Sequence, residues 1–120
     1  MAKKEIILCD TDVLINYLKG DEKTKKAFAL IGMDNIAFSI ITCAEIYKGA
    51  SSKVEFELLK RTLEKYTIYP LNEDISDIFN GHIINYTLSH RIGIPDALIA
   101  ATAVSLGLKL FMDIPSILTT

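Results

Sequence analysis

Residues 5–12 read EIILCDTD, an apolar run that ends abruptly in acidic residues. The run 5–9 has the length of a strand. Its lack of polar alternation is typical of a strand covered on both faces, as in a parallel sheet. Asp10, Thr11 and Asp12 are residue types that cap helices, and an apolar helical pattern follows them. This step from strand to helix predicts an α/β domain with polar residues where the first strand ends.

The same alternation of strand and helix continues along the chain. Further strands are predicted at 36–40, 67–71 and 108–112, the third of them near a sheet edge because of Pro70. Capping residues such as Thr24, Thr42, Ser52 and Asn72 mark helix starts, and the predicted helices cover 13–19, 24–31, 42–49, 52–66, 72–86 and 96–106. This order predicts a three-layer α/β/α domain with a mostly parallel central sheet of about four strands.

Length and composition fit one globular domain spanning residues 1–120. Half of the 120 residues are apolar and 23% are charged, which supplies a core and argues against a disordered chain. No stretch is long and apolar enough to suggest a membrane span or a signal peptide, so a cytoplasmic protein is expected. Cys9 and Cys43 are then reduced core residues, since two isolated cysteines make neither a disulfide framework nor a zinc site.

Four acids stand near the carboxyl ends of predicted strands: Asp10, Glu45, Asp96 and Asp113. Ligands of open parallel sheets bind at that edge, so these carboxylates are expected to converge there. Carboxylates held together repel one another, and a hard divalent cation such as Mg²⁺ removes that cost. Such a cation also activates water and stabilises a phosphoryl transition state. The pattern therefore indicates metal-assisted hydrolysis of a phosphate ester.

Each acid also has an ordinary structural interpretation. Asp10 or Asp12 would cap the first helix, and Glu45 stands at capping-box spacing from Thr42. Asp96 at a helix N-terminus is favoured by the helix dipole, and Asp113 suits a solvated turn. The joint placement of the acids on one rim, and not any single position, favours a functional site.

Three segments together resemble PIN-domain ribonucleases, and specifically the VapC-like toxins of toxin–antitoxin pairs. They are IILCDTDVLINYL at 6–18, SIITCAEIYKGA at 39–50 and IPDALIAATAVSLGLKLF at 94–111. They stand in the right order, and the resemblance extends over almost the whole chain. The last is the most specific, with its aspartate and its series of small residues. The resemblance implies a PIN-like fold and a Mg²⁺- or Mn²⁺-dependent endoribonuclease.

The resemblance also implies roles for individual residues. Asp10, Glu45 and Asp96 are the metal-binding and catalytic acids, with Asp10 and Asp96 as the principal ligands and Glu45 orienting the metal-bound water. Asp113, one residue before the family's place for a further acid, is a weaker candidate ligand. Supporting residues are Thr11, Asp12 and Thr42, while Lys19 and Lys48 are expected to contact RNA phosphates. The implied partners are an RNA substrate, a small antitoxin that covers the acids with a basic side chain, and a second copy of the chain in a homodimer.

Two departures from the family pattern keep another hypothesis open. Met112 and Ile114 occupy places where the family usually has Thr and then Asn or Asp. A catalytically degenerate domain that binds RNA or a partner without cleavage would tolerate them. A further alternative is a haloacid-dehalogenase-like phosphatase, whose opening Asp-x-Asp motif Asp10 and Asp12 match. Its downstream lysine would have to be Lys109, which lies inside a predicted strand.

Overall fold

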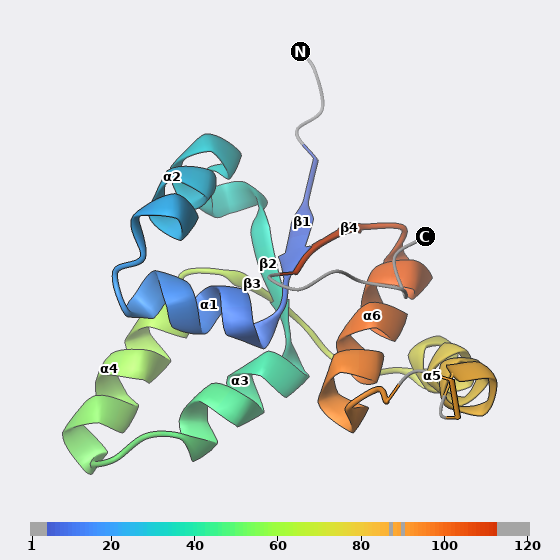
Figure 1. Ribbon diagram of the computed structural model, residues 1–120. Coiled ribbons are helices and arrows are strands. Elements are labelled where there is room, and N and C mark those ends of the chain that lie inside the picture. Colours follow the sequence, from blue (N-terminus) through green and yellow to red (C-terminus); the bar gives the residue numbers. More distant parts are fainter. Residues whose placement is uncertain (1–4, 87, 90, 113–120) are drawn as a thin grey trace.

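The computed structural model describes residues 5–86, 88–89 and 91–112. Within these residues, four strands and six α-helices follow one another in the predicted order, with one short 3₁₀ turn (Figure 1). The strands are β1 (Ile7–Cys9), β2 (Ile36–Ser39), β3 (Thr67–Tyr69) and β4 (Lys109–Phe111). The helices are α1 (Thr11–Leu18), α2 (Glu22–Ile31), α3 (Ile40–Lys48), α4 (Lys53–Leu63), α5 (Glu73–Tyr86) and α6 (Ile94–Leu106), and η1 (Met33–Asn35) is the 3₁₀ turn.

The sheet is fully parallel, with strand order β3-β2-β1-β4. Helices α1 to α4 lie on one side of it and α5 and α6 on the other, which confirms the three-layer prediction (Figure 1). β3 forms an edge as predicted, and Pro70 comes directly after its last residue. The central strands β1 and β2 supply the fully buried positions.

Alternation along the two central strands divides the core between the two helical layers. Phe38 and Cys9 pack with the α1–α4 layer, whereas their neighbours Ala37 and Leu8 pack with Ile99 of α6. Successive side chains of a strand point to opposite faces, so an all-apolar strand fills both layers. The two central strands β1 and β2 are nearly all apolar for that reason.

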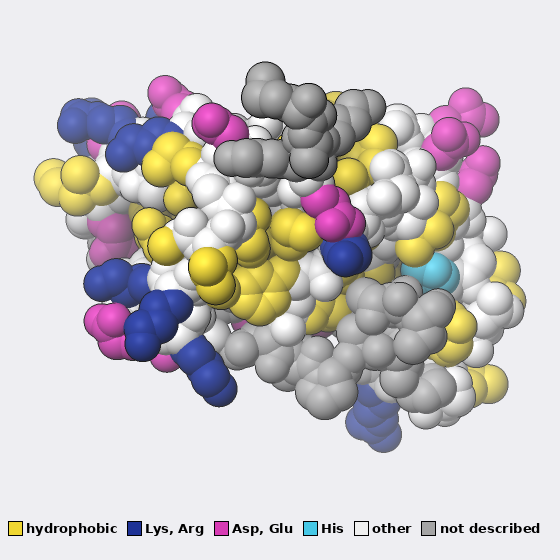
Figure 2. Space-filling view, turned by 90° about the horizontal axis from the view of Figure 1, so that it is seen from above, with side chains coloured by type: hydrophobic (Ala, Val, Ile, Leu, Met, Phe, Trp, Pro, Cys, Tyr) yellow, Lys and Arg dark blue, Asp and Glu magenta, His cyan; other side chains and the backbone are white. Residues whose placement is uncertain are grey.

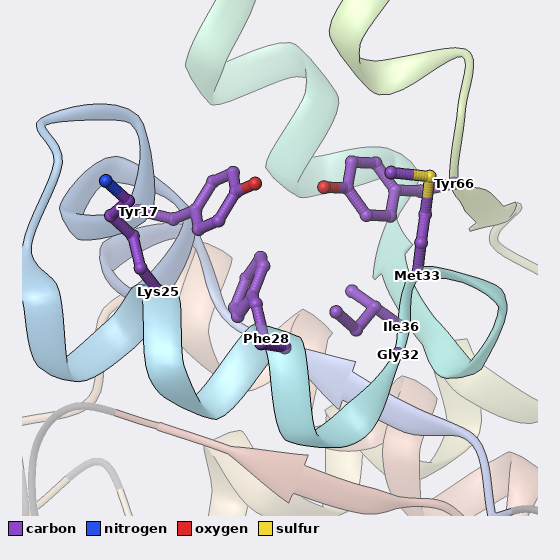
Figure 3. A pocket seen from close by; sticks show the side chains of 8 residues that line it. Tyr17, Lys25, Phe28, Gly32, Met33, Ile36 and Tyr66 are labelled. Atoms are coloured by element: carbon purple, nitrogen blue, oxygen red, sulfur yellow. The ribbon is translucent and has the colours of Figure 1, made fainter.

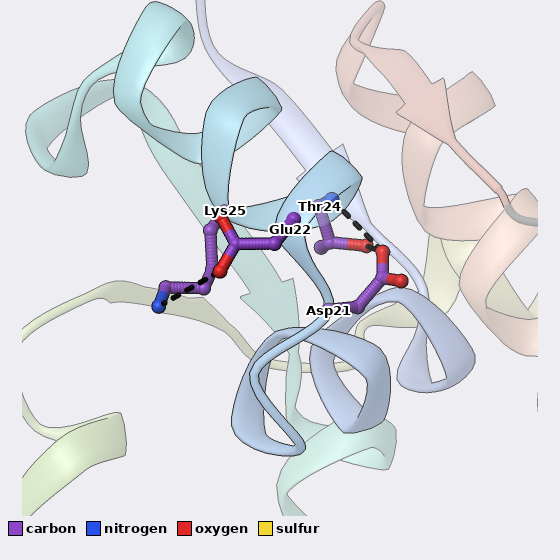
Figure 4. Close-up of polar contacts among 4 residues, drawn as sticks. All are labelled: Asp21, Glu22, Thr24 and Lys25. Carbon is purple, nitrogen blue, oxygen red and sulfur yellow. Dashed lines mark hydrogen bonds and ion pairs between the residues drawn. The ribbon is translucent and has the colours of Figure 1, made fainter.

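Two predicted helix starts are wrong. Asp21, not Thr24, caps α2: its carboxylate accepts hydrogen bonds from the Thr24 backbone N–H at 3.0 Å and from the Thr24 hydroxyl at 2.7 Å (Figure 4). Ser39, not Thr42, caps α3 by accepting from the Ile41 N–H. In both cases a better-placed capping residue lies three positions earlier, and the predicted cap sits within the first turn.

Candidate functional site

Asp10 sits where β1 ends and α1 begins. The side chain is only 2% exposed, and its Oδ1 accepts a hydrogen bond of 2.9 Å from the Val13 N–H. Its own N–H donates to the Phe111 carbonyl of β4 at 3.1 Å, which ties this position to the sheet. Asp10 is therefore the helix cap that the structural interpretation predicted, and the cap fixes the carboxylate at the carboxyl edge of the central strand. Capping and ligand binding are compatible roles for one carboxylate.

A chain of hydroxyls joins α1 to α3 beside Asp10. The Thr11 Oγ1 lies 2.6 Å from Glu45 Oε1 and 3.1 Å from Thr42 Oγ1. Because the Thr11 hydroxyl has one proton and a carboxylate only accepts, that proton goes to Glu45, and Thr42 donates to Thr11. Thr11 and Thr42 are buried and Glu45 is half-buried. The Glu45 carboxylate is thereby held in place through Oε1, while Oε2 is not used by this contact.

Asp96 completes the cluster from α6, on the other side of the sheet. It lies in the first turn of that helix, is half-buried and follows the Gly93 cap and Pro95. Burial raises the pKa of the Asp96 carboxyl, and the carboxylates of Asp12 and Glu45 raise it further. Acids from α1, α3 and α6 thus share one electrostatic environment. Among the described residues, neither Glu45 nor Asp96 forms an ion pair with a basic side chain.

The raised pKa makes Asp96 a cost to the stability of the metal-free protein. In the unfolded chain the carboxyl has its ordinary pKa of 3.8, so the folded state binds the proton more tightly. Stability contributed by this group is present at low pH and falls as the pH rises through the folded-state pKa. We expect Asp96→Asn, measured in EDTA at pH 7, to raise the melting temperature by roughly 1–4 °C.

The gain should shrink as the pH falls through the folded-state pKa of wild-type Asp96, because its carboxyl then becomes neutral like the amide of the variant. Circular dichroism melts at a series of pH values between 7 and the ordinary carboxyl pKa of 3.8 provide the comparison. A variant that melts below wild type at pH 7 would show that the ionised carboxylate stabilises the fold, and the repulsion described above would be refuted.

The donor atoms of the cluster fit a hard divalent cation. Mg²⁺ and Mn²⁺ prefer oxygen ligands, and the carboxylates and hydroxyls of the cluster supply oxygen atoms. Burial, and then the charge of Asp10, raises the pKa of the neighbouring Cys9 to about 12, so its thiol stays protonated. In the described part of the chain, no three acidic, histidine or cysteine side chains are already arranged as a metal cage. The fit therefore rests on donor chemistry.

The other predicted site residues are placed as follows. Asp12 is exposed in the first turn of α1, and Met112, directly after β4, is half-buried. Asp113 and Ile114 lie outside the described residues. Lys19 and Lys48 are both exposed, at the C-terminal ends of α1 and α3.

The sequence patterns did not predict a groove of about 590 Å³ between α1, α3 and α4. Its apolar walls include Ile15, Leu18, Leu58 and Leu59, and Glu45 and Lys19 also line it. We call this the α1–α3–α4 groove. Leu58 lines the groove from α4 and is 57% exposed.

The comparisons with known proteins agree with this fold. Residues 7–113 match the PIN domain family. The solved structures that the chain resembles include a toxin–antitoxin complex from Klebsiella pneumoniae, which is 28% identical with a TM-score of 0.74 over 87% of this chain and 82% of that one.

Two further structures are similar. FitAcB from Neisseria gonorrhoeae is 26% identical with a TM-score of 0.71 over 88% of this chain and 85% of that one. VapBC-5 from Mycobacterium tuberculosis, a member of the VapBC family of toxin–antitoxin systems, is 27% identical with a TM-score of 0.65 over 94% and 87%. A search of curated protein sequences found no match.

These findings confirm the predicted resemblance to VapC-like PIN ribonucleases. They also decide against the haloacid-dehalogenase alternative, whose required lysine, Lys109, is instead paired with Glu5 at 3.5 Å on the surface of β4. Within the described residues, no helix has the length and apolar character needed to cross a membrane. With its fold, the order of its motifs and a family match over residues 7–113, the chain belongs to the PIN domain family.

Proposed function

We propose that this protein is the toxin of a toxin–antitoxin pair and acts as a Mg²⁺- or Mn²⁺-dependent endoribonuclease that hydrolyses RNA phosphodiester bonds. A VapC-like nuclease is what the family and the fold indicate; the metal, the RNA substrate and the residue roles are proposals. The observation that carries them is the shared environment of Asp12, Glu45 and Asp96, whose mutual repulsion a bound cation would relieve.

The side chains suggest a division of labour. Asp10 and Asp96 would hold the cation, since each is anchored at a helix N-terminus beside the sheet edge. When bound, the cation supplies positive charge that offsets the charge developing on the phosphoryl group and acidifies water. Glu45, positioned by Thr11 through Oε1, is then placed to accept a proton from attacking water through Oε2. Asp12, which is exposed, would add negative charge next to Asp96 without holding the cation directly.

Substrate contacts would come from the exposed lysines at the same end of the molecule. Lys19 lines the α1–α3–α4 groove together with Glu45, and Lys48 lies one turn beyond Glu45 in α3. Both positions suit contacts to RNA phosphates near the acidic cluster, because phosphate contacts position a nucleic acid without reading its sequence.

An antitoxin partner is supported by the relatives and by the groove. The Klebsiella structure is a toxin–antitoxin complex, and this chain presents an apolar groove that Glu45 lines. A partner segment with apolar side chains would fill the groove, and an Arg or Lys of that segment would neutralise the acids. Binding there would block substrate access, which is how an antitoxin would inhibit this enzyme.

A homodimer is also part of the proposal. Large apolar side chains stand exposed around α5 and α6, including Ile84 at 71%, Ile94 at 63% and Val104 at 51%. Burial of these side chains against a second copy of the chain would remove apolar surface from water, which favours a dimer. Sedimentation equilibrium is expected to give twice the chain mass of 13.3 kDa, and a mass of one chain at micromolar concentration would contradict the dimer.

Cleavage of total small RNA tests the proposed activity. We expect the wild-type chain to cut with Mg²⁺ or Mn²⁺ and to be inactive in EDTA. If folded protein binds RNA but leaves it intact with either ion, the degenerate binding domain becomes the better description. Met112, in a place where the family usually has Thr, would then be the first residue to revert to the family type.

A further inference from the structure

A second pocket lies at the opposite end of the sheet from the acidic cluster. It measures about 290 Å³, and its lining includes Tyr17, Phe28, Ile36 and Tyr66. Ile36 begins β2 and Tyr66 immediately precedes β3, so the pocket is at the amino ends of the strands. Figure 2 looks onto this end of the molecule, where hydrophobic side chains gather with basic side chains beside them. We call it the aromatic pocket.

The walls of the aromatic pocket consist largely of flat rings that contact one another or the core. Tyr17 of α1 stacks on Phe28 of α2 with ring centroids 4.3 Å apart and planes inclined by 16°. Tyr66 is held from behind by an edge contact with Phe38, and Met33 lies beside it (Figure 3). Such surfaces favour a planar ring as ligand, because aromatic faces stack and thioethers adapt.

Two hydroxyl groups in the aromatic pocket can orient a ligand through hydrogen bonds. The hydroxyls of Tyr17 and Tyr66 point toward each other across it (Figure 3). Burial raises the pKa of Tyr66 to about 12, and the neighbouring Tyr17 raises it as well, so the Tyr66 hydroxyl keeps its proton. Only one hydroxyl donates in the hydrogen bond between the two tyrosines, so the hydrogen of the other remains to donate to a ligand. This arrangement suits a ring that carries acceptor atoms.

Lys25 adds a positive charge to the lining, on the Tyr17 side (Figure 3). Its ammonium is 3.8 Å from Glu22, but both side chains are more than half exposed, at 51% and 78% (Figure 4). Exposed pairs of this kind contribute little, so Lys25 is readily released to an anionic ligand. Lys23 and Lys26 of the same helix leave its surroundings net positive.

The volume sets the size of the ligand. A cavity of roughly 150 Å³ takes one benzene ring, so about twice that space holds a one- or two-ring heterocycle but not the sugar and phosphate attached to it. The phosphate of such a ligand would lie outside, at Lys25. We propose that the aromatic pocket is a nucleotide site that captures one unpaired base and pairs its phosphate with Lys25. RNA as the source of that base rests on the proposed function, whereas the pocket itself does not.

Binding can be measured without cleavage, on the whole chain in EDTA. Aromatic NMR signals of Tyr17, Phe28 and Tyr66 are followed during titration with AMP, UMP, ribose 5-phosphate and an unstructured RNA of about ten nucleotides. We expect shifts with the base-containing ligands and none with ribose 5-phosphate. Response to the mononucleotides alone would identify free nucleotide as the ligand, and response to the oligonucleotide alone would identify RNA.

Three variants distinguish binding in the pocket from nonspecific electrostatic attraction of the nucleotide to the lysines. Lys25→Ala should raise the dissociation constant about three- to tenfold, while Lys23→Ala, on the same helix but outside the lining, should change it less than about twofold. Ala29→Leu fills space at an exposed lining position and should weaken binding more than about tenfold without lowering the melting temperature.

The nucleotide site would be overturned by an absence of shifts at these rings, by equal shifts with ribose 5-phosphate, or by equal losses in the two lysine variants. Binding with no RNA cleavage in either Mg²⁺ or Mn²⁺ would refute the proposed function and leave the nucleotide site unaffected. RNA cleavage without these shifts would support the proposed function and refute the nucleotide site.

Discussion

Asp10→Asn is expected to lower metal-dependent RNA cleavage at least about 100-fold, equivalent to roughly 2.7 kcal/mol in the activation free energy. The reason is the loss of a negative ligand at the most buried acid of the cluster, 2% exposed. An amide keeps the shape of the side chain but gives up the charge that a hard cation requires. Initial rates on RNA with saturating Mg²⁺ or Mn²⁺ measure the effect.

This substitution separates activity from folding better than removal of the side chain. Asp10 caps α1 through Oδ1, and asparagine caps helices about as well as aspartate. The melting temperature should therefore stay close to that of wild type. Asp34→Asn is the matched control, since Asp34 is exposed in η1 at the amino end of β2. Activity retained within about threefold in Asp10→Asn would remove Asp10 from the metal site.

Leu14→Ala is expected to cost about 2–5 kcal/mol of unfolding free energy. Leu14 is fully buried on the sheet-facing side of α1, packed with the core that includes Phe38 and Val13. A domain of this size has a total stability of only about 5–15 kcal/mol, so the loss is a large fraction of it. Urea unfolding followed by circular dichroism gives the free energy and shows whether the m-value is preserved.

Leu30→Ala is the control, because it makes the same truncation at an exposed position. Leu30 lies in α2 and is 89% exposed, so the same truncation removes little buried surface and should change stability by less than about 0.5 kcal/mol. Similar losses at the two positions would mean that α1 does not pack against the sheet as described. The acids that α1 positions would then lack a rigid support.

Much of the fold follows from local sequence patterns. The strand predicted at 5–9 and the helix predicted at 96–106 correspond to β1 and α6, because the apolar run of the first and the flanking Pro95 and Gly107 of the second are strong local signals. Gly107 ends α6 in the left-handed conformation, with φ at 66°, where glycine is favoured. The second strand was predicted to extend to residue 40, whereas in the structure β2 ends at Ser39 and Ile40 begins α3. Adjacent apolar residues suit the end of a strand and the start of a helix equally.

The candidate site was predictable as a set of acids at strand ends, and its internal contacts were not. Capping spacing suggested that Thr42 and Glu45 interact with each other, whereas Ser39 caps the helix and leaves Thr42 to bond with Thr11. That pairing joins residues 31 positions apart, and no local rule encodes it. The α1–α3–α4 groove and the aromatic pocket were missed for the same reason, because each is assembled from elements that meet only in the folded chain.

The central claim is that Asp10, Glu45 and Asp96 form one divalent-cation site at the carboxyl edge of the sheet. Paramagnetic line broadening by Mn²⁺ in backbone NMR spectra tests this claim most directly. At substoichiometric Mn²⁺, the amide signals of residues 10–12, 45 and 96 should broaden first, and excess Mg²⁺ should restore them. Uniform broadening, or broadening centred on other exposed acids such as Glu55 and Glu57, would contradict the account.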